Sequence, residues 1–164
     1  MNARPAIWTD PPGRRSGNSA LILNPNGDVA MVEPPYTGGK LILPGGSAEA
    51  NEAPNEAAAR HVLAETGLVL DLWQVVAVDW VSAGDVPEGM NLVFWGGQLT
   101  EFKASKLAAR PVEESGVLRA VWVPVNELAS VTTTHQRARV IDALRSMERG
   151  AGVPLLLRGL PAGA

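Results

Sequence analysis

The stretch from Glu52 to Glu65 gathers the side chains of this chain that are best suited to chemistry. It has a glutamate at each end, with Arg60 and His61 between them. Residues four apart on a helix share a face, so His61 and Glu65 are expected to be neighbours. Carboxylate oxygens bind hard cations such as Mg²⁺, whereas a neutral imidazole suits Mn²⁺ or Zn²⁺ better. The spacing therefore places an imidazole and a carboxylate side by side on one helix.

The same residues also have an ordinary structural interpretation. A glutamate just before a helix N-terminus, as Glu52 would be, is favoured by the helix dipole. Glu56 and Arg60 have the spacing of a common i,i+4 ion pair, and Glu65 would be unremarkable as a solvated helix residue. Spacing alone favours this ordinary interpretation for Glu52 and Arg60.

The wider stretch 46–68 resembles the Nudix box, G-x5-E-x7-R-E-U-x-E-E-x-G-U, in which U is an aliphatic residue. The fixed letters are matched by Gly46, Glu52, Arg60, Glu65 and Gly67, and the aliphatic positions by Val62 and Leu68. Two positions differ, because His61 and Ala64 stand where the pattern has glutamates. The match is strong evidence for ancestry and weaker evidence for activity.

The resemblance implies an α/β/α sandwich around a mixed β-sheet. It also implies a hydrolase that cleaves a diphosphate linkage in a nucleoside di- or triphosphate derivative, by metal-assisted attack of water. Glu65 and Glu52 would then hold Mg²⁺ or Mn²⁺, with His61 as a further ligand. The Gly45 carbonyl could join the metal shell, and Arg60 would orient the acidic residues.

The missing glutamates leave two questions open. Other carboxylates could replace them. The candidates are Glu49 in the loop, the pair Glu113 and Glu114, and Asp85 and Glu88 in another loop, although each is more often a solvated surface charge. Alternatively, the chain is a catalytically silent domain of the same fold that binds a nucleotide or a partner protein. The residues that select a substrate are unknown, since loops 34–39, 83–90 and 101–116 carry no motif.

The hydrophobic pattern predicts strands that alternate with two long helices. The box helix is expected over 54–66, because proline suits a first helical turn and Gly67 a helix end. A last helix should start near Thr134 with Thr133 and Gln136 as a capping box, and its arginines, Arg139 among them, should face solvent. Strands are expected over 19–24, 28–33, 40–43, 71–82, 91–100 and 117–123.

Length and composition favour one globular domain over 1–164. The chain has 164 residues, no cysteine and a net charge of −3, which excludes disulfides and argues against a nucleic-acid-binding surface. No apolar run is long enough for a signal peptide or a membrane helix, so a cytoplasmic protein is expected.

The two ends are expected to be irregular. Residues 1–17 look like a lead-in that Trp8 could attach to the domain, and the other tryptophans, Trp73 included, are expected in the core. The tail 151–164 is apolar and interrupted by proline, so it should pack on the domain or on a second subunit without forming an element. This tail motivates the prediction of a homodimer.

Overall fold

The computed structural model describes residues 5–11, 13–150, 153, 155–157 and 159–161. The helices are α1 (Ala6–Thr9), α2 (Pro54–Thr66), α3 (Glu101–Ala104), α4 (Val112–Ser115), α5 (Leu128–Val131) and α6 (Thr134–Arg149), with 3-10 turns η1 (Pro35–Thr37) and η2 (Val125–Glu127). The strands are β1 (Arg15–Leu23), β2 (Val29–Glu33), β3 (Gly45–Ser47), β4 (Val75–Val81), β5 (Gly89–Gln98), β6 (Arg119–Val123), β7 (Leu155–Leu157) and β8 (Leu160–Pro161).

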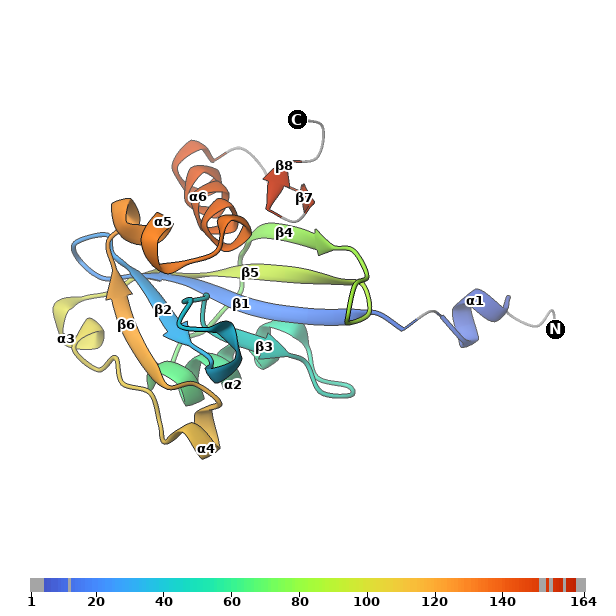
Figure 1. Ribbon diagram of the computed structural model, residues 1–164, viewed down its shortest axis with the longest axis horizontal. Coiled ribbons are helices and arrows are strands. Elements are labelled where there is room, and N and C mark those ends of the chain that lie inside the picture. Colours follow the sequence, from blue (N-terminus) through green and yellow to red (C-terminus); the bar gives the residue numbers. More distant parts are fainter. Residues whose placement is uncertain (1–4, 12, 151–152, 154, 158, 162–164) are drawn as a thin grey trace.

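One mixed sheet forms the middle layer. Its strand order is β6-β2-β1-β5-β4-β7-β8, and β3 pairs with β1 outside this path. β1 runs parallel to β5, and β4 runs parallel to β7, while the other pairs are antiparallel. Figure 1 shows α5 and α6 on one side of the sheet and α2 on the other. The predicted α/β/α sandwich with a mixed sheet is therefore confirmed.

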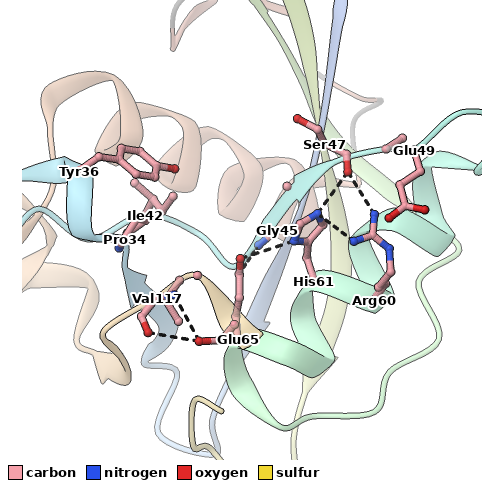
Figure 2. Close-up of a pocket in the computed structure, with 14 residues that line it drawn as sticks. Pro34, Tyr36, Ile42, Gly45, Ser47, Glu49, Arg60, His61, Glu65 and Val117 are labelled. Atoms are coloured by element: carbon pink, nitrogen blue, oxygen red, sulfur yellow. Dashed lines mark hydrogen bonds and ion pairs between the residues drawn. The ribbon is translucent and has the colours of Figure 1, made fainter. Parts of the chain in front are cut away.

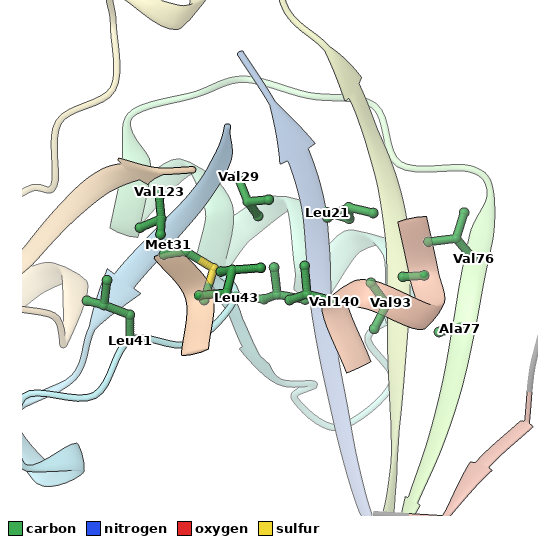
Figure 3. Close-up of a cluster of buried hydrophobic side chains, with 12 residues drawn as sticks. Leu21, Val29, Met31, Leu41, Leu43, Val76, Ala77, Val93, Val123 and Val140 are labelled. Carbon is green, nitrogen blue, oxygen red and sulfur yellow. The ribbon is translucent and has the colours of Figure 1, made fainter. Parts of the chain in front are cut away.

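Strand β1 is buried on both faces, which fixes the helices relative to the sheet. Successive side chains on a strand point to opposite faces. Leu21 belongs to the cluster of buried side chains that contains Val140 of α6 and is drawn in Figure 3. Ala20 and Ile22 belong to the second cluster, which contains Val62 of α2. Both helices that were expected from the sequence are thus held against the same central strand.

The two long helices are where the sequence predicts them. α2 begins at Pro54 and ends at Thr66, and Gly67 follows in the left-handed conformation with φ 71°. α6 begins at Thr134, and the hydroxyl of Thr133 accepts a hydrogen bond from the backbone N–H of Gln136. Local signals place these helices correctly because proline, glycine and threonine act within one turn of the helix end.

Three strand predictions are wrong in detail, and one strand was not predicted. The strand expected over 71–82 begins only at Val75. The strand expected over 19–24 already begins at Arg15, where it pairs with β5. Residues 40–43 form only one bridge, between Ile42 and Val32. The chain forms its next strand, β3, at Gly45, which the sequence did not predict because glycine-rich segments carry no strand pattern.

Both ends of the chain also differ from expectation. Trp8 does not attach the lead-in, since its side chain is 74% exposed, and Trp73 precedes β4 and is also exposed. The tail does form elements, because β7 pairs with β4 and β8 pairs with β7. Within the described residues, no helix is long and apolar enough to cross a membrane.

Candidate active site

The loop before α2 and the last turns of α2 bring the predicted residues together. β3 pairs with β1 and so holds the double glycine beside the helix. The backbone N–H of Gly45 donates a hydrogen bond of 2.7 Å to Oε2 of Glu65. The Glu65 residue is only 5% exposed, although it is charged. A carboxylate on α2 is therefore fixed against the backbone of the glycine turn.

His61 lies between Glu65 and the loop, as Figure 2 shows. Its Nδ1 is 3.7 Å from Oε1 of Glu65, and its Nε2 is 3.2 Å from the carbonyl oxygen of Ser47. A Cβ at Gly46 would overlap the imidazole ring, so glycine is required there for the ring to lie on the loop. The expectation that His61 and Glu65 are neighbours on one face is borne out by this distance.

The surroundings of His61 favour its charged form. The Glu65 carboxylate raises the pKa of His61 above its ordinary value of 6.5, and the Ser47 carbonyl raises it further. Partial burial and the charge of Arg60 act in the opposite direction. Because the net pKa shift is upward, the imidazole keeps its proton to higher pH than a free histidine does.

Glu52 and Arg60 form a tight ion pair at the start of the site. Arg60 Nε donates to Oε1 of Glu52 at 2.7 Å, and Nη2 donates to Oε2 at 2.7 Å. Oε2 also accepts a hydrogen bond from the backbone N–H of Glu49. The arginine hydrogen bond, helped by that backbone bond, lowers the pKa of Glu52 to about 2. Both oxygens of Glu52 are thus engaged, and its role as a metal ligand stays a prediction.

A cleft of about 510 Å³ opens over these residues. Small-molecule sites typically have volumes of ~300–1,000 Å³, so the cleft can hold a ligand. Its lining includes Gly45, Gly46, Ser47, Glu49, Arg60, His61, Glu65, Tyr36, Ile42 and Val117. Figure 2 shows Tyr36 facing the box residues across the cleft.

The candidate replacement carboxylates are distributed differently. Glu49 lines the cleft, on the loop before α2. Glu113 and Glu114 lie on α4 and do not line it, and Glu114 pairs instead with Arg110 at 3.9 Å. Ala64 contributes no donor atom from its side chain. The described part of the cleft therefore offers Glu65, His61 and Glu49 on its walls, with Glu52 held behind Arg60.

The prediction that Arg139 faces solvent is wrong. The Arg139 residue is 6% exposed, and its Nε donates to Oδ2 of Asp79 at 2.9 Å. Asp79 is fully buried and also accepts a hydrogen bond from the backbone N–H of Gly159. The sequence did contain a signal for this pair. Asp79 is a single charged residue within the apolar strand VVAVDWV, and a buried charge needs a partner of opposite charge.

A family model described as NUDIX domain matches residues 13–144 of the chain. The chain belongs to the NUDIX domain family. The match covers β1 to β6, the residues that line the cleft, all of α2 and most of α6, so it includes the elements that position the candidate residues.

Several solved structures share this NUDIX fold. The chain is similar to the MutT protein from Methanosarcina mazei Go1, with 19% identity, a TM-score of 0.66, and 85% of this chain and 96% of that chain covered. It is similar to the NUDIX hydrolase from Nitrosomonas europaea, with 20% identity, a TM-score of 0.63, and coverages of 87% and 93%. A third is an ADP-ribose pyrophosphatase from Streptococcus suis 89-1591, with 15% identity, a TM-score of 0.58, and coverages of 88% and 99%. Among curated proteins, none matches this chain.

NUDIX hydrolases generally use divalent metals, so the donor set of this site can be compared with that need. Among the described residues, no group of three or more His, Asp or Glu side chains could hold a metal by itself. Mg²⁺, however, is usually bound by one or two carboxylates together with substrate phosphates. Glu65, fixed beside the glycine turn, fits a single ion shared with a substrate and does not fit a resident cluster of ions.

Proposed function

We propose that this chain is a NUDIX hydrolase that cleaves a diphosphate linkage in a nucleoside di- or triphosphate derivative. Membership of the family supports hydrolysis. The observation that carries the proposal is Glu65, a buried carboxylate at the wall of a cleft, held by the Gly45 N–H. A buried charge is costly unless it is paired, and here its pairing leaves it beside the space where a ligand fits.

The remaining box residues have distinct roles in this proposal. Arg60 binds Glu52 and also donates to the Ser47 carbonyl at 3.2 Å, so it holds the loop against α2. His61 contacts Ser47 and Glu65, and it orients the carboxylate that faces the cleft. We therefore infer that Arg60 is a positioning residue. Glu65 is the residue that faces the ligand.

A divalent ion, Mg²⁺ or Mn²⁺, would be held by Glu65, with His61, Glu52 and the Gly45 carbonyl as further candidate ligands. When bound, the ion would neutralise the diphosphate charge and lower the pKa of the attacking water. The chain itself supplies the rigid turn, the buried carboxylate and a cleft that positions the substrate. Phosphoryl transfer depends mainly on such positioning and charge neutralisation.

The test is turnover of a nucleotide panel by the purified chain with Mg²⁺ or Mn²⁺. The wild type should release product, and Glu65→Gln should lose at least about 100-fold in rate, as expected when charge stabilisation is removed. Glu148→Gln, an exposed glutamate on α6, is the matched control and should retain full activity. Equal turnover by wild type and Glu65→Gln would refute the assignment of Glu65.

A catalytically silent binding domain is the second candidate, and the absence of a metal-binding group among the described residues favours it. It predicts nucleotide binding that persists in EDTA and yields no product. Calorimetry with and without EDTA, followed by product analysis of the same samples, separates the two candidates. Metal-dependent binding with product release would reject the silent domain.

A small-molecule nucleotide is the proposed partner. The homodimer and the cytoplasmic location remain predictions. The tail that motivated the homodimer is partly used within the chain, because Leu155–Leu157 pair with β4. Light scattering at tens of micromolar would decide between monomer and dimer.

A further inference from the structure

The cleft over the box continues into two smaller cavities that the proposed function does not yet use. Their volumes are about 180 Å³ and 390 Å³, and both are lined by Tyr36, Ile42, Arg15, Asn91, Gln136 and Arg139. The smaller one shares Gly45, Gly46 and Ser47 with the box cleft. We call these two cavities the side groove. A ligand whose diphosphate lies at the box can therefore extend into it.

Hydrogen-bond donors dominate the side groove. No acidic side chain is among the described residues that line it. Arg15 donates through Nε to the Pro87 carbonyl, which leaves its terminal NH₂ groups without a hydrogen bond to any described residue. The aromatic ring of Tyr36, which is 82% exposed, offers a flat apolar surface beside these donors. Such a groove suits a planar ligand that carries acceptor atoms.

The side-chain amide of Gln136 is a hydrogen-bond donor whose orientation is fixed by the buried ion pair of Arg139 and Asp79. Arg139 donates hydrogen bonds from Nε and Nη2 to Oδ2 of Asp79, and its Nη1 donates to Oε1 of Gln136 at 3.3 Å. A guanidinium has no acceptor, so the amide of Gln136 must turn its oxygen to Arg139. The NH₂ group of Gln136 is then left to donate. No described residue accepts a hydrogen bond from that NH₂ group. Because Gln136 lines the groove, the NH₂ group is available to a ligand there.

Asn91 provides an amide without a fixed direction. Its side chain makes no hydrogen bond to the residues that the structure describes, and it packs so closely on Gly17 that a Cβ there would overlap Oδ1. An amide can either donate or accept, so Asn91 adapts to its ligand. Gln136 cannot adapt in this way, because Arg139 holds its oxygen.

We propose that the side groove binds the nucleobase of the substrate and that Gln136 selects bases with a carbonyl oxygen over bases with an amino group at the same position. This inference rests on the proposed function, and it names the class of substrate. Arg139 is a positioning residue here, since it acts through Gln136. The amides of Gln136 and Asn91 and the ring of Tyr36 point to a base, whereas Arg15 and Lys40 keep their charge, so phosphate is an alternative ligand that the experiment must distinguish.

Binding of nucleoside monophosphates in EDTA tests the proposal without any need for activity. By calorimetry, the wild type should bind UMP about tenfold more tightly than CMP, and GMP about tenfold more tightly than AMP, since an unmatched polar group is costly. Gln136→Glu keeps the shape and the bond to Arg139 but replaces the donor by an acceptor. It should abolish or reverse both preferences. Gln74→Glu, on the surface before β4, is the matched control and should keep them.

A second variant tests the positioning role. Arg139→Lys keeps a positive charge for Asp79 but cannot hold Asp79 and Gln136 together. It should reduce the ratio of UMP to CMP affinity more than it reduces the affinity for UMP itself. A uniform loss for all four nucleotides would mean that Arg139 has only a structural role.

The outcomes separate this inference from the proposed hydrolase. Equal affinities for the paired nucleotides, no binding of any of them, or unchanged preferences in Gln136→Glu would overturn the inference alone. Competition by inorganic phosphate, without base preference, would instead identify an anion site and also overturn it. Preference for UMP and GMP with no hydrolysis of any member of the nucleotide panel in Mg²⁺ or Mn²⁺ would overturn the hydrolase for that panel and still support base selection by Gln136.

Discussion

At the scale of single residues, the state of His61 depends on its neighbour Glu65. The carboxylate is the largest cause of the raised pKa, so removing its charge should lower the pKa of His61. NMR titration of the imidazole should give a midpoint above 6.5 in the wild type and a lower midpoint in Glu65→Gln. The chain has only 2 histidines, and His61→Ala assigns the signal. An unchanged midpoint in Glu65→Gln would contradict the pairing.

The raised pKa of His61 also sets the pH range of any metal binding through its ring. A ligating imidazole must be neutral, so a proton competes with the ion. Since the pKa lies above 6.5, affinity for Mn²⁺ should rise as pH increases through a window above that value. His61→Ala should flatten this rise, and Mn²⁺ should bind better than Mg²⁺ in the wild type. If calorimetry gives the same pH dependence for both proteins, His61 is not a ligand.

The pKa of Glu52 is shifted in the opposite direction to that of His61, so its pH dependence also differs. Its folded pKa of about 2 is below the ordinary value of 4.5, so its pairing with Arg60 stabilises the fold above pH 4.5. That stabilisation is lost as pH falls through the folded pKa. In urea unfolding, the wild type should therefore have a higher free energy of unfolding than Glu52→Gln near pH 6. This difference should shrink towards pH 2. Glu148→Gln serves as a control, and a difference independent of pH would refute the ion-pair account.

At the scale of elements, the face of α2 can be rebuilt. The double substitution His61→Glu with Ala64→Glu restores the acidic residues of the family pattern. Without metal, like charges three and four residues apart should destabilise the helix by about 0.2–0.5 kcal/mol per pair. Mg²⁺ should then raise the thermal midpoint of the variant much more than that of the wild type. If the variant folds and binds Mg²⁺ tightly but hydrolyses no nucleotide, the defect lies outside the box and the silent binding domain is favoured.

The same element shows what sequence can and cannot predict. The limits of α2 were predictable because Pro54 and Gly67 act locally. The contacts of His61 and Glu65 with Gly45 and Ser47 were not, since they depend on β3, a strand of the glycine turn that carries no hydrophobic alternation. The spacing of the box thus gives the candidate residues, and their partners come from the pairing of β3 with β1.

At the scale of the whole molecule, prediction fails mainly where distant segments meet. The side groove is built by β1, β5, α6 and the turn around Tyr36, so no local pattern could reveal it. The tail has strand character only because β4 presents a free edge to Leu155–Leu157. The apolar run in β1 predicted a strand, and the resemblance of residues 46–68 to the Nudix box accounts for the correct fold class.

The ion pair of Asp79 and Arg139 joins three of these segments, because it links β4 to α6 and to Gly159 of the tail. Arg139→Met should destabilise the fold by about 3–5 kcal/mol, since it leaves a buried carboxylate without a partner. Adding Asp79→Asn removes that charge and keeps an acceptor for the Gly159 N–H. The double variant should therefore be more stable than Arg139→Met alone.

Urea unfolding of both variants measures this difference, and the exposed pair of Arg145 and Asp142 provides the control. Arg145→Met should cost less than about 1 kcal/mol, because solvent screens an exposed pair. If the double variant were no more stable than Arg139→Met, the cost would come from lost packing of the arginine. The buried charge would then contribute little to joining the tail to the sheet.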